Sequence, residues 1–163
     1  MRTQTPWRNT LDTTTPPFPA SLPTPRTGER GPTVLAEALT VSADADHRGA
    51  LALLTRALRD RAQGHPDSLG EVHTEDRDDG HRTVALWTSP VGLRDFVTAA
   101  HTDLLAFRER TGVSPTVERT LWWARANEVT GREALRRSAH LREHGPGPGA
   151  FTLRSPVPPP SRM

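Results

Sequence analysis

Apolar and polar residues along the middle of the chain follow two alternating periods. Where apolar residues recur at every second position we expect strands, and where they recur at every third or fourth position we expect helices. The predicted strands are residues 33–41, 69–75, 82–88 and 116–125. The predicted helices lie between Asp44 or Asp46 and Gly64, between Ser89 and Gly112, and between Thr130 and Gly145.

The ends of these elements carry residue types that such ends favour. Ser89 and Pro90 form an N-cap followed by proline at the first helical position. Thr130 and Glu133 form a capping box, and Asp79-Gly80 is a favoured tight-turn dipeptide between the second and third strands. The element order is therefore β-α-β-β-α-β, followed by one extra helix.

This order is that of the ferredoxin-like unit, an α+β fold in which two helices cover one face of a four-stranded antiparallel sheet. The other face of the sheet would be left bare, and its Val, Leu and Trp side chains would form an exposed apolar patch. A second copy packed sheet to sheet would cover that patch. We therefore predict a symmetric homodimer.

Proline divides the chain into three parts. Seven of the 16 prolines fall in residues 1–32 and six in residues 146–160. The Thr/Pro-rich leader, residues 1–32, has no period and too little apolar content to offset its chain entropy, so we predict that it is disordered. Residues 33–145 then form the folded domain, and the Pro/Gly-rich tail, residues 146–163, packs on that domain.

Composition excludes several classes of function. The chain has no cysteine, which excludes disulfides, cysteine nucleophiles and cysteine-ligated metal sites. Its basic residues and its 19 acidic residues interleave, whereas a nucleic-acid-binding protein gathers positive charge on one face. No apolar run reaches the ~18 residues that a membrane span needs, and no Sec-type signal is visible. We expect a cytoplasmic protein.

Several segments of the sequence resemble a bacterial domain family of unknown function. They are the run Val84–Ser89, the helix segment Leu93–His101, the pair Trp122-Trp123 with Leu121, and the C-terminal stretch His140–Pro160. The resemblance covers residues 33–160 and is most specific in the C-terminal stretch. That family is placed among the dimeric α+β barrel proteins, near the spheroidene-monooxygenase-like group.

The resemblance implies a class of activity. The wider superfamily includes cofactor-independent antibiotic biosynthesis monooxygenases, haem-degrading monooxygenases, chlorite-dismutase-like proteins and non-enzymatic stress proteins. It therefore implies a small-molecule tailoring enzyme of oxygenase or related redox type that acts on an apolar or aromatic metabolite. The alternative is a non-catalytic protein that binds a small molecule or serves as a dimeric accessory module.

His101 is the first candidate for a catalytic residue. It lies on the flank of the apolar stripe of the second helix, so its imidazole could reach the space between that helix and the sheet. The resemblance implies an acid–base role for His101, or a role as the proximal ligand of a haem cofactor. The plain alternative is a surface histidine that is hydrogen-bonded to a backbone carbonyl or to water.

Aromatic residues provide the predicted substrate pocket, with Phe96 and Val97 contributing from the second helix. Trp87 can form a wall or stack on a flat substrate, and it is the second candidate catalytic residue, although an aromatic side chain in a small sheet is more often core. Trp122 and Trp123 are adjacent on one strand, so they point to opposite faces of the sheet. Which of them faces the pocket is left open by the pattern.

Polar candidates follow the fourth strand. Arg125 could hold a carboxylate or a haem propionate, although an exposed surface arginine is the simpler interpretation. Asn127 is the third candidate catalytic residue, because Asn127 and Glu128 stand near the position where the resembling family has a histidine.

Two histidine clusters suggest metal binding but have simpler explanations. His73, Glu75 and His81 can face one another across the predicted hairpin, yet exposed hairpin ends collect polar residues anyway, and we predict no metal site. His140 and His144 are one turn apart on the last helix. Given the resemblance, we interpret them as anchors for the C-terminal tail.

Overall fold

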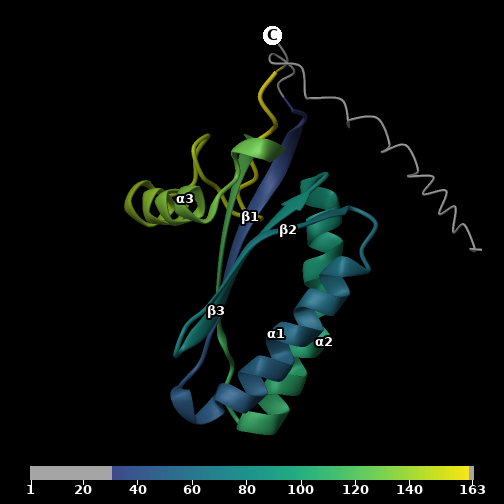
Figure 1. Cartoon of the computed structure of the whole chain (residues 1–163), viewed down its shortest axis with the longest axis vertical. Helices are drawn as coiled ribbons and strands as arrows, with labels where there is room; N and C mark the ends of the chain where they lie inside the picture. The colour runs from purple at the N-terminus through teal and green to yellow at the C-terminus, as the bar shows by residue number, and fades with distance from the viewer. Residues whose placement is uncertain (1–30, 162–163) are drawn as a thin grey trace, which may run out of the picture.

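Strands and helices follow one another in the predicted order (Figure 1). The structure, a computed structural model, describes residues 31–161, so the predicted disordered leader lies outside the described residues except for its last two positions. The strands are β1 (Thr33–Ser42), β2 (Ser68–Asp76), β3 (Gly80–Trp87) and β4 (Thr116–Arg125). The helices are α1 (Arg48–Gln63), α2 (Pro90–Thr111) and α3 (Gly131–His144), with single turns η1 (Ala45–His47) and η2 (Ala126–Glu128).

The sheet confirms the ferredoxin-like α+β fold. Its strand order is β2-β3-β1-β4 with antiparallel neighbours throughout. The connection from β1 to β2 therefore runs through α1 and the connection from β3 to β4 through α2, as the β-α-β-β-α-β order requires. Within the described residues no helix is both long enough and apolar enough to cross a membrane.

Two of the three predicted helix starts are confirmed. The Ser89 hydroxyl accepts a hydrogen bond from the Gly92 backbone N–H at 3.2 Å, and the Thr130 hydroxyl accepts one from the Glu133 N–H at 3.1 Å. The predicted cap of α1 by Asp44 or Asp46 is wrong, because neither side chain caps it. The turn η1 intervenes and moves the start of α1 beyond the reach of Asp44.

One face of the sheet packs on α1 and α2 to form the main core. Alternate residues of the central strands point to this face, and Leu93, Phe96 and Phe107 of α2 pack against them. The buried members of this core are Leu35, Val41, Leu51, Leu54, Leu58, Trp87, Leu93, Phe96, Ala100, Phe107, Leu121 and Phe151.

The second face is not bare, which corrects the sequence-based prediction. Helix α3 lies on this side of the sheet (Figure 1) and buries Trp122 and Ala36 beneath Ala134. Further along the same face, Arg82 bonds to Thr40 and pairs with Glu75. The turn η2 reverses the chain after β4, so the extra helix folds back over the apolar part of the face. The observation that motivated the homodimer is therefore missing, and the homodimer itself stays a prediction.

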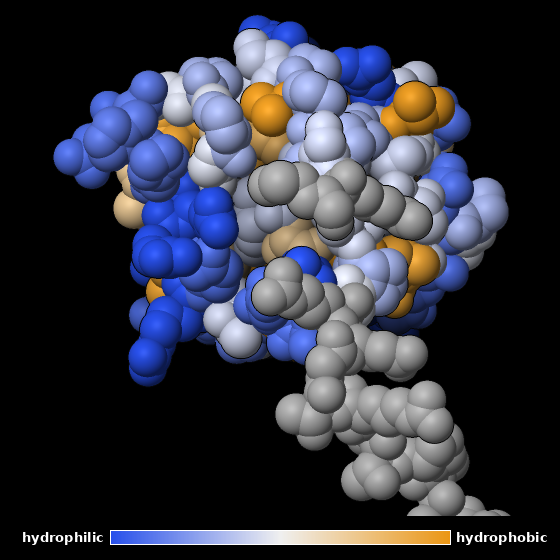
Figure 2. Space-filling view, turned by 90° about the horizontal axis from the view of Figure 1, so that it is seen from above, coloured by the Kyte–Doolittle hydropathy of each residue, from blue (hydrophilic) through white to orange (hydrophobic). Residues whose placement is uncertain are grey.

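The outer side of α3 is strongly polar. Seen from above, hydrophilic side chains gather on the side where α3 lies, and hydrophobic side chains appear there as separate groups (Figure 2).

Trp122 belongs to the second face, whereas Trp123 lies on the face of α1 and α2. The structure thus decides which of the two tryptophans points which way.

The C-terminal tail lies along the free edge of β4. Leu121 and Phe151 exchange backbone hydrogen bonds of 2.9 and 2.8 Å, and Phe151 is fully buried. The Trp123 indole N–H donates to the Val157 carbonyl at 2.7 Å. The Arg137 guanidinium of α3 donates to the Gly149 carbonyl at 2.6 Å, beside His140. The tail therefore covers an edge that would otherwise offer unpaired backbone groups.

We expect Phe151→Ala to lower the free energy of unfolding by about 3–5 kcal/mol, the usual cost of removing a fully buried phenylalanine. Val157→Ala is the matched control in the tail, and because Val157 is only half-buried it should cost about 1 kcal/mol or less. Urea unfolding followed by circular dichroism measures both. Equal costs for the two variants would mean that the tail does not complete the core.

The carboxylate of Glu133 stabilises α3 in a pH-dependent way. The hydrogen bond from Arg136 holds the pKa of Glu133 below its ordinary value, partial burial opposes this, and the hydrogen bond from Arg137 lowers it further. A carboxyl whose pKa is lower in the folded state adds stability above its unfolded pKa and loses that contribution as the pH falls through the folded value. The contribution is therefore complete at pH 7 and disappears in acid.

We expect Glu133→Gln to destabilise the protein slightly at pH 7 and progressively less as the pH falls below about 4.5, the ordinary value for this group. Urea titrations at pH values between 7 and 3 test this. Glu143→Gln removes an exposed carboxylate at the other end of α3 and serves as the control. A difference between wild type and Glu133→Gln that does not shrink in acid would contradict the prediction.

Candidate functional site

A cavity lies between α1 and the sheet, on the side of β2 and β3. Its empty volume is about 570 Å³ when the open mouth is included. Four of the nine residues that line it from α1 and β3 are small: Thr55, Ala62, Thr83 and Ala85. The sequence-based prediction placed the pocket between the second helix and the sheet, but α2 contributes only Phe96. The space exists on the α1 side because short side chains leave it unfilled.

Glu37 of β1 is the buried polar group of this cavity. Only 3% of the residue is exposed, and it lines the cavity from the middle of an apolar strand. The Trp87 indole N–H donates to its Oε2 at 2.8 Å, and the Arg119 Nε–H donates to its Oε1 at 2.6 Å. A carboxylate at this depth is costly unless it is hydrogen-bonded or paired, and here each oxygen has one donor.

The sheet register brings these three side chains together. Leu35 pairs with Trp87 and Leu39 pairs with Arg119, so the two donors stand on the same face as Glu37, diagonally to either side of it. Diagonal neighbours in a sheet lie within reach of long and aromatic side chains. Strands β3 and β4, which are far apart in sequence, thus each supply one partner to the central strand.

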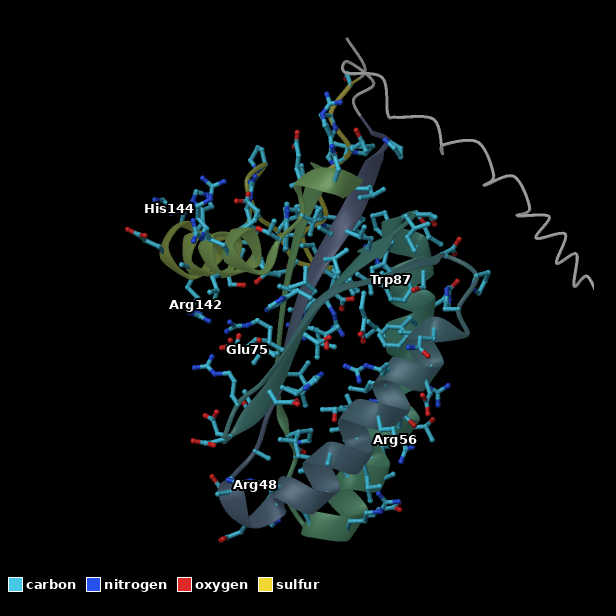
Figure 3. The ribbon with its side chains drawn as sticks, in the orientation of Figure 1. Arg48, Arg56, Glu75, Trp87, Arg142 and His144 are labelled. Atoms are coloured by element: carbon cyan, nitrogen blue, oxygen red, sulfur yellow. The ribbon has the colours of Figure 1, made fainter. Side chains whose placement is uncertain are left out.

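Aromatic rings form the wall next to Glu37. The Trp87 and Phe96 rings have centroids 5.2 Å apart, and the His65 ring stands edge-on to Trp87 at 5.5 Å. Figure 3 shows Trp87 on the side of the sheet that faces α1 and α2, with Glu75 on the opposite side. The indole of Trp87 is thereby fixed on both sides, by the hydrogen bond to Glu37 and by stacking.

Of the predicted pocket residues, Trp87 and Phe96 line the cavity. Val97 is half-buried and packs against the main core without lining the cavity. Trp123 lines a separate groove beside Pro156–Pro160, and Trp122 lies on the other face of the sheet. Neither tryptophan lines the cavity beneath α1, because that cavity lies beside β3 and β2 and β4 is at the opposite edge; Trp123 packs on the helix side of the sheet.

The predicted position of His101 is also wrong. The residues of α2 that face the core include Phe96, Ala100 and Phe107, and His101 lies one residue past Ala100, about 100° around the helix. Its side chain is exposed and does not line the cavity. The imidazole therefore points outward and does not reach the space between helix and sheet.

Arg125 and Asn127 do not reach the cavity either. Arg125 ends β4 and is half-buried, and Asn127 is exposed on the turn η2. Both lie at the end of the edge strand farthest from β2 in the sheet order. The structure thus separates these residues from Trp87, with which the sequence analysis had grouped them.

The hairpin histidines are divided between the two faces. His73 and Glu75 pair with Val84 and Arg82, whereas His81 pairs with Val41 on the face of the cavity. No group of three or more metal-ligating side chains is gathered within residues 31–161. His81 lines the cavity and hydrogen-bonds to Asp76, so it belongs to the rim of the site.

Sequence reasoning missed both Glu37 and Arg119. Glu37 is the one charged residue of β1, and the alternation places it with Leu35, Leu39 and Val41 on the helix-facing side. The available signal for a buried polar group was a carboxylate at a position that follows the alternation of core residues along the strand. Arg119 gave no such signal, because its partner lies 82 residues away.

Comparison with known proteins identifies a domain family. Residues 40–163, about three quarters of the chain, match a domain of unknown function, DUF3291. No protein among the curated sequences matches the chain.

Three solved structures illustrate the structural likeness. PA3566 from Pseudomonas aeruginosa is 19% identical with a TM-score of 0.48, covering 58% of this chain and 97% of its own. SnoaB, a cofactor-independent oxygenase from Streptomyces nogalater, is 16% identical with a TM-score of 0.40, covering 61% and 95%. MupZ from Pseudomonas fluorescens is 11% identical with a TM-score of 0.41, covering 83% and 93%. With TM-scores under 0.5, the family assignment rests on the domain match.

We expect Glu37→Gln to destabilise the protein by about 1–3 kcal/mol, because the amide keeps one acceptor oxygen but leaves a donor facing Arg119 or Trp87. Glu37→Leu should cost more, since it leaves both donors without their partner. Urea unfolding gives both values. A Leu variant as stable as wild type would show that the carboxylate does not hold these side chains.

Proposed function

The chain belongs to the DUF3291 family, and we propose that the cavity beneath α1 binds an apolar or aromatic small molecule which the protein oxidises. The observation that carries the proposal is Glu37, a buried carboxylate at the base of a cavity walled by Trp87 and Phe96. Each oxygen of a carboxylate accepts more than one hydrogen bond, so Glu37 keeps acceptor capacity for a hydroxyl or N–H group of a ligand. Apolar walls with a few placed polar groups are typical of small-molecule sites.

The proposed reaction is of the oxygenase type. Val84–Ser89 and the C-terminal stretch resemble a domain family that is placed near monooxygenase-like proteins, and this placement supports the class. In the cofactor-free form of this reaction, Glu37 accepts a proton from an activated CH₂ group of the substrate, and the resulting carbanion reacts with dioxygen. The CH₂ group becomes a carbonyl, one oxygen atom enters the product and the other leaves as water. The substrate supplies all four electrons, so the step needs no further reductant.

A haem held by His101 does not fit the residues present. The sequence resemblance implied that group, but the His101 side chain is exposed on α2 and lines none of the cavity. Arg125, which was to hold a propionate, lies on β4 away from the cavity. The proposed reaction therefore does not use haem.

The second candidate is a non-catalytic binding protein. Both oxygens of Glu37 already accept one hydrogen bond each, from Trp87 and Arg119, which is also what a purely structural buried pair looks like. In that case the cavity would hold a ligand without turnover. Binding and oxygen uptake must therefore be measured separately.

We expect wild-type protein to bind N-phenyl-1-naphthylamine, a neutral apolar dye with one N–H donor, with a rise in dye fluorescence. Ala62→Phe fills the cavity from α1 and should weaken binding at least tenfold. Ala52→Phe adds the same volume to an exposed position of the same helix and should leave binding unchanged. Equal affinities of the two variants would place the dye elsewhere.

The same proteins test turnover with anthracen-9(10H)-one, a flat ketone with an activated CH₂ group. An oxygen electrode should record uptake above the protein-free rate for wild type and a loss of at least tenfold in Glu37→Gln. Uptake at the protein-free rate, with dye binding intact, would favour the non-catalytic binding protein.

A further inference from the structure

The mouth of the cavity lies between α1 and the edge strand β2. The base of the cavity is closed, with Glu37 and Trp87 only 3% and 1% exposed. The lining side chains contributed by Arg59 and Glu71 are 37% and 28% exposed. A ligand that reaches Glu37 must therefore pass between these two elements.

Strand β2 is the weakest wall of the cavity. Every residue of β2 after Ser68 is exposed, and β2 has β3 as its neighbour on one side only. Its pairing with β3 shifts register between Ser68 and Gly70 and again between Glu71 and His73. Gly70 has a φ of 107°, a conformation that favours glycine. Interrupted ladders and exposed backbone are the features of segments that open locally at low cost.

Three side chains close this wall onto α1. The Arg59 Nε–H donates to Glu71 Oε1 at 2.8 Å, and its second guanidinium nitrogen donates to the Thr74 hydroxyl at 3.4 Å. The Thr74 hydroxyl in turn donates to Glu71 Oε2 at 3.2 Å. We name Arg59, Glu71 and Thr74 the latch.

Helix α1 is fixed on its other side. Arg61 of α1 forms two hydrogen bonds to Asp103 of α2, at 2.7 and 3.3 Å. The leucines of α1 are buried in the main core, and β2 contributes no residue to that core. When the latch opens, the part that is free to move is therefore β2.

We propose that the latch controls entry to the cavity: residues 68–74 move away from α1 when Arg59 releases Glu71, and a ligand enters through that gap. This inference rests on the proposed binding function of the cavity. An exposed ion pair is weak, so the latch adds only modestly to the β2–β3 ladder in holding the closed state. In this arrangement β2 and the latch select ligands by size, and Glu37 recognises the hydroxyl or N–H group of the ligand.

Stopped-flow binding of N-phenyl-1-naphthylamine tests the latch. Arg59→Gln should raise both the association and the dissociation rate about two- to fivefold, because gate opening precedes both steps. Arg56→Gln is the matched control, because Arg56 is exposed on the same helix and lies on the side of α1 that faces away from the sheet (Figure 3). Rates in Arg59→Gln equal to those in Arg56→Gln would overturn the inference.

A cross-link gives the opposite perturbation. The chain has no native cysteine, so an Arg59→Cys, Glu71→Cys variant can be joined by bismaleimidoethane at those two positions alone. Joining them should slow dye association at least tenfold, whereas capping both with N-ethylmaleimide should not. Association that is equally fast in the joined protein would show that ligands enter elsewhere.

Hydrogen exchange separates failure of the latch from failure of the proposed function. Amides of residues 68–74 should exchange faster in Arg59→Gln than in Arg56→Gln, with no ligand present. If wild type does not bind the dye, the proposed function fails, and the exchange rates still decide whether the latch holds β2. Unchanged exchange in Arg59→Gln would refute the latch on its own.

Discussion

A carboxylate on the helix-facing side of a sheet has to be hydrogen-bonded, and the surroundings of Glu37 follow from that constraint. Its two oxygens accept from Trp87 and Arg119, which come from the strands on either side of β1. The need for two hydrogen-bond donors fixes the indole of Trp87 and turns the guanidinium of Arg119 toward Glu37. The same carboxylate is what distinguishes the cavity from a purely apolar void.

The cavity itself results from side-chain size. Helix α1 buries Leu51 and Leu54 away from the cavity. The residues that it contributes to the cavity are Thr55, Leu58, Arg59, Ala62 and Gln63, of which Thr55 and Ala62 are small. Edge strand β2 has few apolar side chains to fill the remaining space, since Leu69 and Val72 are both exposed. The space beside this edge strand is therefore only partly filled.

The fold could be predicted because each element carries its own period and end signals. The strands and helices begin and end within about two residues of the predicted positions, apart from the start of α1. The site could not be predicted in the same way. His101, Arg125 and Asn127 were chosen by residue type and resemblance, and the structure places them outside the cavity, whereas Trp87 and Phe96 line it.

By itself the sequence determined the order of elements, the caps at Ser89 and Thr130 and the alternation that directs side chains to one face or the other. These depend on interactions within a few residues, which a single chain segment contains. Only the tertiary structure decided that α3 covers the second face of the sheet, that Trp123 hydrogen-bonds to the C-terminal tail, and that Glu37 pairs with Arg119. The last two of these contacts join residues 34 and 82 positions apart, and the register and packing that bring them together are properties of the whole sheet.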